Sequence, residues 1–257
     1  MLLLSTSSLK WYWIHKIFIL VKKAKYDWID LVIDEKNFDT LDKEYLKSLS
    51  DEFKLPILSI TAPDKWLSRQ KIDKLVEMAK LFSSQVINFY PPHISDKNAD
   101  EFIKYLPKIK KDLRISITVQ NVEQKFKLFV IPEYKNNNLI ELKKITQDTA
   151  LNIENIDKSS GIDLLKAQNI LWNTIVNIYL SDRDGVRQWL LPWNAGWWLS
   201  YLPIESFLMK LKSFGYNSFF SLRVKPTELW AWYDEKVLEN LEQFKNYYKK
   251  NFLDYKV

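Results

Sequence analysis

The chain has 257 residues, of which 47% are hydrophobic and 15% aromatic, and a net charge of +6 from 38 basic and 32 acidic residues. This composition supplies a large core and excludes an intrinsically disordered chain. The absence of cysteine, with only two histidines and four glycines, excludes thiolate or multi-histidine metal sites, cysteine nucleophiles, disulfide scaffolds and glycine-rich phosphate loops.

The first residues carry no targeting or membrane signal. The apolar stretches 1–4 and 11–21 are too short to span a bilayer, and neither has the pattern of a signal peptide. Lysines make up 33 of the 38 basic residues and are scattered among acidic residues, which indicates a solvated surface rather than a nucleic-acid-binding stripe. We therefore expect a cytoplasmic protein with no membrane and no nucleic-acid partner.

Short apolar runs alternate with longer amphipathic stretches along the whole chain. The predicted strands begin near Leu2, Trp28, Pro56, Val86, Arg114, Ala150, Ile175 and Ser218. The predicted helices cover 41–53, 71–82, 100–113, 161–172, 203–214 and 235–252. The strands are apolar on both faces, which is typical of parallel strands covered by helices. This pattern predicts the α/β class and a single (β/α)8 TIM barrel spanning 1–257, with an open doubly wound sheet as the alternative.

Functional residues of such barrels lie at the carboxyl ends of the strands. The polar residues predicted there are Thr61, Tyr90, His93, Gln120, Glu154, Asp157, Tyr179, Asp182 and Arg223. His93 follows two prolines, so we expect an exposed loop histidine without a role.

The order of segments in the final third carries a resemblance to a known family. IYLSD, the PWNAG loop, PIESFLMKLKSFGYNSFFSLRV and a closing helix follow one another as in the xylose isomerase-like barrels. That family includes sugar phosphate isomerases and epimerases and an apurinic endonuclease group. Its members typically end their strands with histidines and acids that hold one to three divalent metals, so the resemblance implies where ligands would stand.

In the first half of the barrel those positions are altered. The His-Ala-Pro that usually ends strand three is matched by Thr61 with Ala62 and Pro63, and the usual histidine of strand four by Tyr90. Gln120 stands where strand five usually has glutamate. In strand six, Glu154 and Asp157 stand in the Asp-x-x-His pattern.

The second half is altered further. Tyr179 and Asp182 replace the His-x-x-Asp of strand seven, and Trp189 best matches the histidine before the next loop. Arg223 replaces the glutamate that closes strand eight. A permanent positive charge about 4 Å from a dication opposes it by roughly 8 kcal/mol at an effective dielectric near 20. We therefore expect the metal site to be lost, with Arg223 paired to Glu154 or Asp182.

Three functions remain open. The first is a divergent sugar phosphate isomerase/epimerase-like protein without cofactor, which binds a small polar ligand, possibly a sugar or sugar phosphate, or is inactive. Its ligand-binding residues would be Thr61, Tyr90, Gln120, Tyr179, Arg183, Trp189 and Arg223. The second is an active Mg²⁺- or Mn²⁺-dependent sugar isomerase or epimerase with Glu154, Asp157 and Asp182 as catalytic residues, although an ion-pair cluster with Arg223 is the simpler interpretation. A DNA-repair endonuclease is disfavoured because its zinc site is rich in histidine.

The third function is an interaction or scaffold protein. Six tryptophans follow strands seven and eight: Trp189, Trp193, Trp197, Trp198, Trp230 and Trp232. They could cap the helix ends, form a homo-oligomer interface or stack on a ligand. The insert 129–149 is either a solvated crossing loop or a flap over the mouth.

Overall fold

The structure is a computed structural model that describes residues 1–65, 67–112, 114–123, 125–127, 130–135, 137–156, 163–184, 187–193 and 202–256. Eight parallel strands form a closed barrel in the order β1-β12-β9-β8-β5-β4-β3-β2. Their bounds are β1 Leu2–Ser5, β2 Trp28–Val32, β3 Ile57–Thr61, β4 Val86–Phe89, β5 Ser116–Gln120, β8 Asp148–Asn152, β9 Ile175–Leu180 and β12 Phe219–Leu222. The prediction of a single (β/α)8 barrel is confirmed, and the open sheet is excluded by the pairing of β1 with β12.

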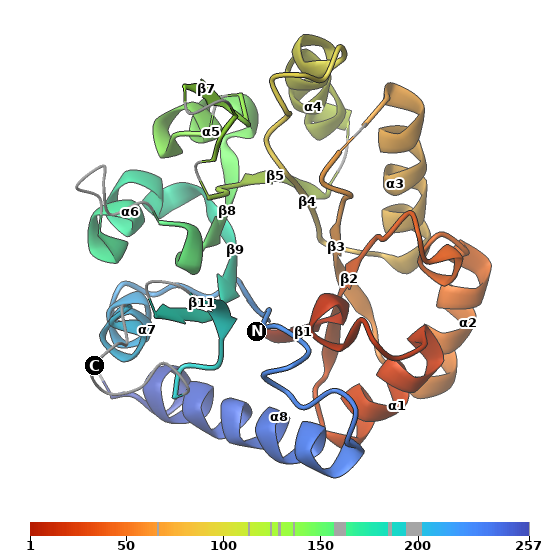
Figure 1. Ribbon diagram of the computed structural model, residues 1–257, viewed down its shortest axis with the longest axis vertical. Coiled ribbons are helices and arrows are strands. Elements are labelled where there is room, and N and C mark those ends of the chain that lie inside the picture. Colours follow the sequence, from red (N-terminus) through yellow and green to blue (C-terminus); the bar gives the residue numbers. More distant parts are fainter. Residues whose placement is uncertain are drawn as a thin grey trace.

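Helices surround the barrel and cover the outer face of every strand (Figure 1). They are α1 Ile14–Lys23, α2 Lys43–Phe53, α3 Arg69–Phe82, α4 Ala99–Asp112, α5 Leu139–Thr146, α6 Leu164–Leu171, α7 Ile204–Ser213 and α8 Asp234–Tyr248. Side-chain caps explain several starts: Asp42 accepts from the Tyr45 amide, and Asn138 accepts from the Glu141 amide, both at 2.9 Å. No helix in the described ranges is both long and apolar enough to cross a bilayer.

Among the helix ends with a positive φ, two give a pair of opposite predictions. Gly215 after α7 has φ +78°, and Ser83 after α3 has φ +57°. A Cβ at Gly215 would meet no atom within 4 Å, so only backbone strain opposes it. We expect Gly215→Ala to lower the free energy of unfolding by about 1 kcal/mol and Ser83→Gly to raise it by about 0.5–1 kcal/mol. Urea denaturation measures both changes in the free energy of unfolding. Changes of the same sign in the two variants would contradict the left-handed backbone conformation at these positions.

The inside of the barrel is layered. Leu3, Leu58, Val86 and Phe219 form a buried cluster separate from the main core. Two residues further along β1, β4 and β12 lie the polar side chains of Ser5, Asn88 and Ser221, because alternate residues of a strand face the same side. The buried polar residues of this second layer include Ser5, Asp30, Ser59, Asn88, Thr118, Asn177 and Ser221. The amino end of the barrel is thus closed by apolar residues, and the carboxyl end is lined by polar ones.

Two short pairs of antiparallel strands lie at the carboxyl end of the barrel. β6 (Phe126–Lys127) pairs with β7 (Ile131–Pro132) in the insert, and β10 (Asp182–Asp184) pairs with β11 (Arg187–Leu190) after β9. The crossing-loop interpretation of the insert is wrong for 139–146, because that segment is α5, the helix between β5 and β8. In the tryptophan-rich loops, Trp193 packs on Phe244 and Tyr247 of α8, with ring centroids 6.3 and 6.1 Å apart. Trp197 and Trp198 lie outside the described residues.

Candidate functional site

Arg223 follows β12 and lies at the centre of the carboxyl-end opening, hereafter the mouth. Its side chain is only 4% exposed. One guanidinium nitrogen donates to Gln120 Oε1 at 3.2 Å, and the other donates to the Tyr90 hydroxyl. The guanidinium carbon also lies 4.9 Å from the centre of the Tyr179 ring and 4.7 Å from that of the Trp189 ring. Four residues singled out from the sequence therefore meet around one cation.

The expected pairing of Arg223 with Glu154 or Asp182 is wrong. No ion pair of the described residues joins Arg223 to a carboxylate. The guanidinium instead uses a hydroxyl, an amide oxygen and the faces of aromatic rings, which attract cations through their quadrupoles. Arg223 still affects two buried carboxyls at longer range, since its charge lowers the pKa of both Asp30 and Glu154 against the effect of burial.

Asp30 was missed by the sequence analysis. It lies on β2 with no exposed surface, and its Oδ1 accepts from Ser59 Oγ at 2.6 Å and from Thr61 Oγ1 at 3.1 Å. Thr61 Oγ1 is also 2.7 Å from the Tyr179 hydroxyl, so a chain of hydrogen bonds runs from Asp30 to the ring under Arg223. Burial raises the pKa of Asp30, while the Ser59 hydrogen bond and the Arg223 charge lower it. The sequence signal that could have identified Asp30 is a charged residue inside the apolar run WIDLVI, residues 28–33.

Glu154 is a second buried carboxyl of the mouth with a raised pKa. It follows β8, has no exposed surface, and accepts a 2.6 Å hydrogen bond at Oε2 from the Trp189 amide. Its Oε1 is buried without a hydrogen-bond partner. Burial raises the pKa of Glu154 to about 8, although the Trp189 hydrogen bond and the charges of Arg223 and Arg183 oppose that rise. A carboxyl with a pKa this close to neutrality can hold or release a proton at physiological pH.

Asp182, a second predicted catalytic carboxylate, lies away from Arg223. Asp182 is buried at the start of β10 and lines a separate pocket of about 230 Å³ beside α7 with Glu205 and Tyr247. Asp182 lies beyond the end of β9 at Leu180 and belongs to the β10–β11 pair rather than to the barrel sheet. Arg183 donates to the Ile156 carbonyl at 2.8 Å. Asp157 lies outside the described residues.

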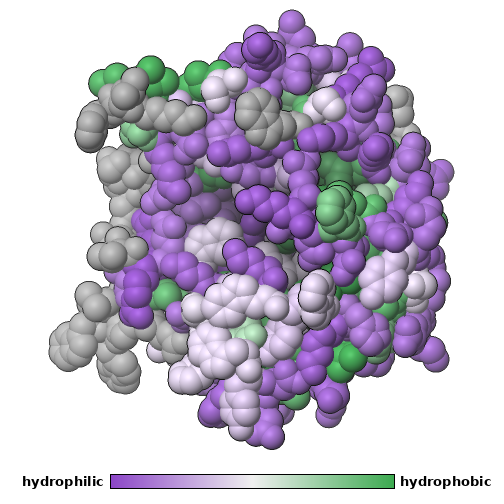
Figure 2. Space-filling model, turned by 45° about the vertical axis from the view of Figure 1, so that its right-hand side comes forward, coloured by the Kyte–Doolittle hydropathy of each residue, from purple (hydrophilic) through white to green (hydrophobic). Residues whose placement is uncertain are grey.

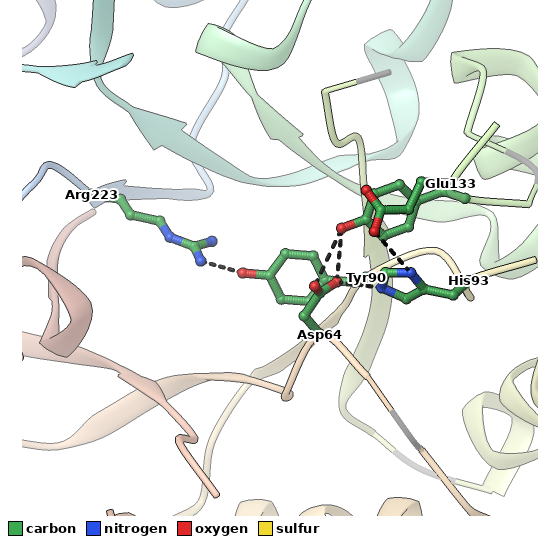
Figure 3. A network of polar contacts seen from close by, with 6 residues as sticks. Asp64, Tyr90, His93, Glu133 and Arg223 are labelled. Carbon is green, nitrogen blue, oxygen red and sulfur yellow. Dashed lines mark hydrogen bonds and ion pairs between the residues drawn. The ribbon is translucent and has the colours of Figure 1, made fainter. Parts of the chain in front are cut away.

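A second polar cluster lies next to Tyr90. His93 Nε2 is 3.3 Å from Asp64 Oδ1, and His93 Nδ1 is 3.6 Å from Glu133 Oε1. The Tyr134 hydroxyl donates to Asp64 at 3.1 Å, and its ring lies 4.4 Å from that of His93. Figure 3 shows the Arg223 guanidinium at the hydroxyl of Tyr90, with Asp64 and His93 beyond the opposite side of the Tyr90 ring. His93 is 5% exposed, so the prediction of an exposed histidine is wrong.

This cluster fastens the insert to the barrel. The Ile94 amide donates to the Glu133 carbonyl at 3.0 Å, and the Lys135 amide donates to the Pro92 carbonyl at 2.8 Å. We expect His93→Ala to speed amide hydrogen exchange in 130–135 by about tenfold, because the side chain that joins Asp64 to Glu133 is lost. The exposed His15→Ala is the control, and exchange that stays unchanged in the His93 variant would contradict this role.

Comparisons with solved structures agree with this architecture. A xylose isomerase domain-containing protein from Salmonella typhimurium LT2 matches with a TM-score of 0.74 at 14% identity, over 96% of each chain. A D-tagatose 3-epimerase-like protein matches with a TM-score of 0.69 at 17% identity, over 97% of this chain and 98% of the other. The chain has the xylose isomerase-like barrel fold. No family model and no curated protein matches the sequence.

The same fold is shared with proteins of other stated chemistry. A probable 3-DHS dehydratase from Bacillus anthracis matches with a TM-score of 0.62 at 15% identity, over 95% of this chain and 98% of the other. In the present xylose isomerase-like barrel, no three His, Cys, Asp or Glu side chains of the described residues lie close enough together to hold a metal ion. The shared fold therefore does not assign a chemistry to the mouth, which depends on the side chains present there.

Proposed function

We propose that this chain is a divergent sugar phosphate isomerase/epimerase-like protein that binds a small polar ligand, such as a sugar or sugar phosphate, without a divalent metal. The observation that carries the proposal is the position of Arg223, whose buried guanidinium occupies the middle of the mouth. An arginine there is always charged, and it presents fixed donors to hydroxyl or phosphate oxygens.

The side chains around Arg223 do not fit a divalent ion. Gln120 Oε1 and the Tyr90 hydroxyl accept hydrogen bonds from the guanidinium, so their oxygen lone pairs are directed at a cation already held by the chain. Divalent magnesium or manganese prefers several carboxylate oxygens. The carboxyls whose pKa Arg223 affects are Glu154, which burial keeps largely protonated, and Asp30, whose Oδ1 already accepts from Ser59 and Thr61.

Unsatisfied polar atoms at the mouth fit a polyhydroxylated ligand. Arg223 Nε and Gln120 Nε2 are buried donors without a partner, and Asn152 Oδ1 and Glu154 Oε1 are buried oxygens without a partner. A buried polar atom left unpaired costs about 1–3 kcal/mol, so a group that pairs with it binds favourably. Each sugar hydroxyl both donates and accepts, which suits this mixture of donors and acceptors.

Metal analysis and binding measurements test the proposal together. We expect less than about 0.1 equivalent of metal in protein purified without chelators, and ligand binding that EDTA leaves unchanged. Calorimetry with a panel of pentoses, hexoses and their phosphates identifies a ligand, and Tyr90→Phe should weaken its binding about tenfold because the Arg223 side chain loses its second hydrogen bond. Tyr105→Phe, at an exposed contact with Asp73, is the control. Stoichiometric metal at the mouth would refute the proposal.

A second candidate function is metal-free isomerisation or epimerisation with Glu154 as the acid/base. It is favoured by the pKa of about 8 and the unpartnered Oε1. The expected result is turnover that resists EDTA and is lost in Glu154→Gln, while ligand binding persists. Turnover that requires added Mg²⁺ or Mn²⁺ would instead support the metal-dependent alternative with Glu154, Asp157 and Asp182.

A further inference from the structure

Three tryptophans form a row on the surface beside the mouth, hereafter the tryptophan row. Trp11, Trp230 and Trp232 are 54%, 51% and 58% exposed. The Trp11 and Trp232 rings are stacked with centroids 5.7 Å apart, and the Trp230 and Trp232 rings are 5.4 Å apart. Large aromatic side chains normally bury most of their surface, so three neighbouring tryptophans with more than half of theirs exposed indicate a binding surface.

The row is held rigidly by the chain beneath it. In the loop between β12 and α8, Leu229 and Ala231 are buried at 0% and 3% exposure, which directs the alternate residues Trp230 and Trp232 outward. Trp230 has φ +57°, a conformation that disfavours a bulky residue by about 1 kcal/mol or more. The Tyr233 amide donates to the Trp230 carbonyl at 2.8 Å. The buried neighbours Leu229 and Ala231 thus set the outward direction of both rings.

The two loops of the row both follow barrel strands at their carboxyl ends. Trp11 belongs to the loop after β1, and Trp230 and Trp232 to the loop after β12, and these strands are paired. An ion pair between Lys16 and Asp234 joins the first turns of α1 and α8, the helices that follow the two loops. Figure 2 shows a broad pale area, the colour of intermediate hydropathy typical of tryptophan and tyrosine, in the lower half of an otherwise mostly hydrophilic face.

We propose that the tryptophan row binds a neutral oligosaccharide. The C–H face of a pyranose ring is apolar and flat, so it stacks on an exposed indole ring, while its hydroxyls bond to polar groups at the rim. The charges next to the row are balanced in sign: Lys16 is paired with Asp234 and Lys236 with Glu239, and Lys10 and Glu235 carry opposite charges. A surface with exposed rings and neutralised charge favours an uncharged ligand over a phosphate polymer. This inference does not depend on which ligand binds at the mouth.

The area of the row argues against a second copy of the chain. Each aromatic side chain offers about 150–250 Å², so three rings that are half exposed present roughly 300 Å². A stable interface needs about 800 Å² from each partner. The aromatic rings are therefore sufficient for two or three sugar units but cover less than half of what a stable dimer requires.

The test uses the full chain and three probes: the hexasaccharides of β-1,4-glucose, β-1,4-xylose and β-1,4-N-acetylglucosamine. Saturation-transfer NMR detects binding, and calorimetry measures the Kd. At least one probe is expected to bind, with the Kd raised about tenfold in Trp232→Ala and in Trp11→Ala and less in Trp232→Phe, which keeps a ring. Trp13→Ala is the matched control, because Trp13 lies in the same loop and is 79% exposed but is not part of the row.

Other outcomes would overturn the inference. Failure of all three probes to bind at millimolar concentration would do so, as would equal losses in the Trp13 and Trp232 variants. Sedimentation velocity and binding of a single-stranded oligonucleotide are measured in parallel. A dimer that dissociates in Trp232→Ala would assign the row to a second copy, and oligonucleotide binding that Trp232→Ala abolishes would assign it to nucleic acid. Each of those results would replace the saccharide.

Discussion

Replacing Arg223 by methionine is expected to lower the free energy of unfolding at pH 7 by about 2–4 kcal/mol. The substitution removes two charge-assisted hydrogen bonds and leaves the Gln120 oxygen and the Tyr90 hydroxyl unpaired inside the barrel. It also removes the cation that lowers the pKa of Asp30 and Glu154, so both carboxyls become harder to ionise. Guanidinium denaturation of both proteins measures the loss.

Arg114→Met is the control for this prediction, because Arg114 is exposed and such surface substitutions usually change stability by no more than about 0.5 kcal/mol. A loss that is no larger for Arg223 than for Arg114 would mean that the guanidinium is solvated rather than enclosed. Addition of Mn²⁺ should leave the stability of both variants unchanged if the mouth holds no metal.

Glu154→Gln is expected to change how stability depends on pH. The pKa of Glu154 is raised from 4.5 to about 8 by burial. Between these values the unfolded chain has lost the proton and the folded chain has kept it, so the folded state binds more protons and the wild-type protein loses stability as pH rises. The contribution is fully present below pH 4.5 and is lost by about pH 8, with a total of at most about 5 kcal/mol.

Glutamine cannot titrate, so the variant should gain stability relative to the wild type from pH 5 to pH 8. Urea denaturation at half-unit pH steps measures the difference between the two proteins. A carbon-13 NMR titration of the labelled glutamate carboxyl follows the same group directly, and its midpoint is expected near 8. A midpoint near 4.5, with a flat stability difference, would show that water reaches the carboxyl.

The barrel could be predicted from the sequence because each strand is a short apolar run followed by an amphipathic helix. All eight strands begin within two residues of their predicted starts, as for Leu2 and Ile175. The weaker signals were missed. α5 was not assigned as a helix, and the ribbons β6–β7 and β10–β11 were not predicted because two- to four-residue strands have no detectable period.

The site was only partly predictable. The expectation that functional residues lie at the carboxyl ends of the strands identified Tyr90, Gln120, Tyr179 and Arg223, which the structure brings together. The sequence could not predict the hydrogen-bond and ring contacts among these residues, because the contacts depend on the direction of each side chain across the barrel. Charge alone suggested that Arg223 would pair with a carboxylate, whereas the enclosed space offers aromatic faces and neutral oxygens. Asp30 was not predicted as a site residue because it lies within a strand rather than at its end.

The expectations for partners and location rest on the sequence alone and stay predictions. They are a cytoplasmic protein, no nucleic acid, no membrane and a possible homo-oligomer. Sedimentation and fractionation experiments address them independently of the mouth.

The central claim is that the Arg223 guanidinium takes the place of a metal ion at the mouth. Crystals grown in millimolar MnCl₂ and measured at the manganese absorption edge test it most directly. We expect no anomalous peak inside the barrel and a guanidinium hydrogen-bonded to Gln120 and Tyr90. An anomalous peak coordinated by Glu154, with the Arg223 side chain turned out of the barrel, would contradict it.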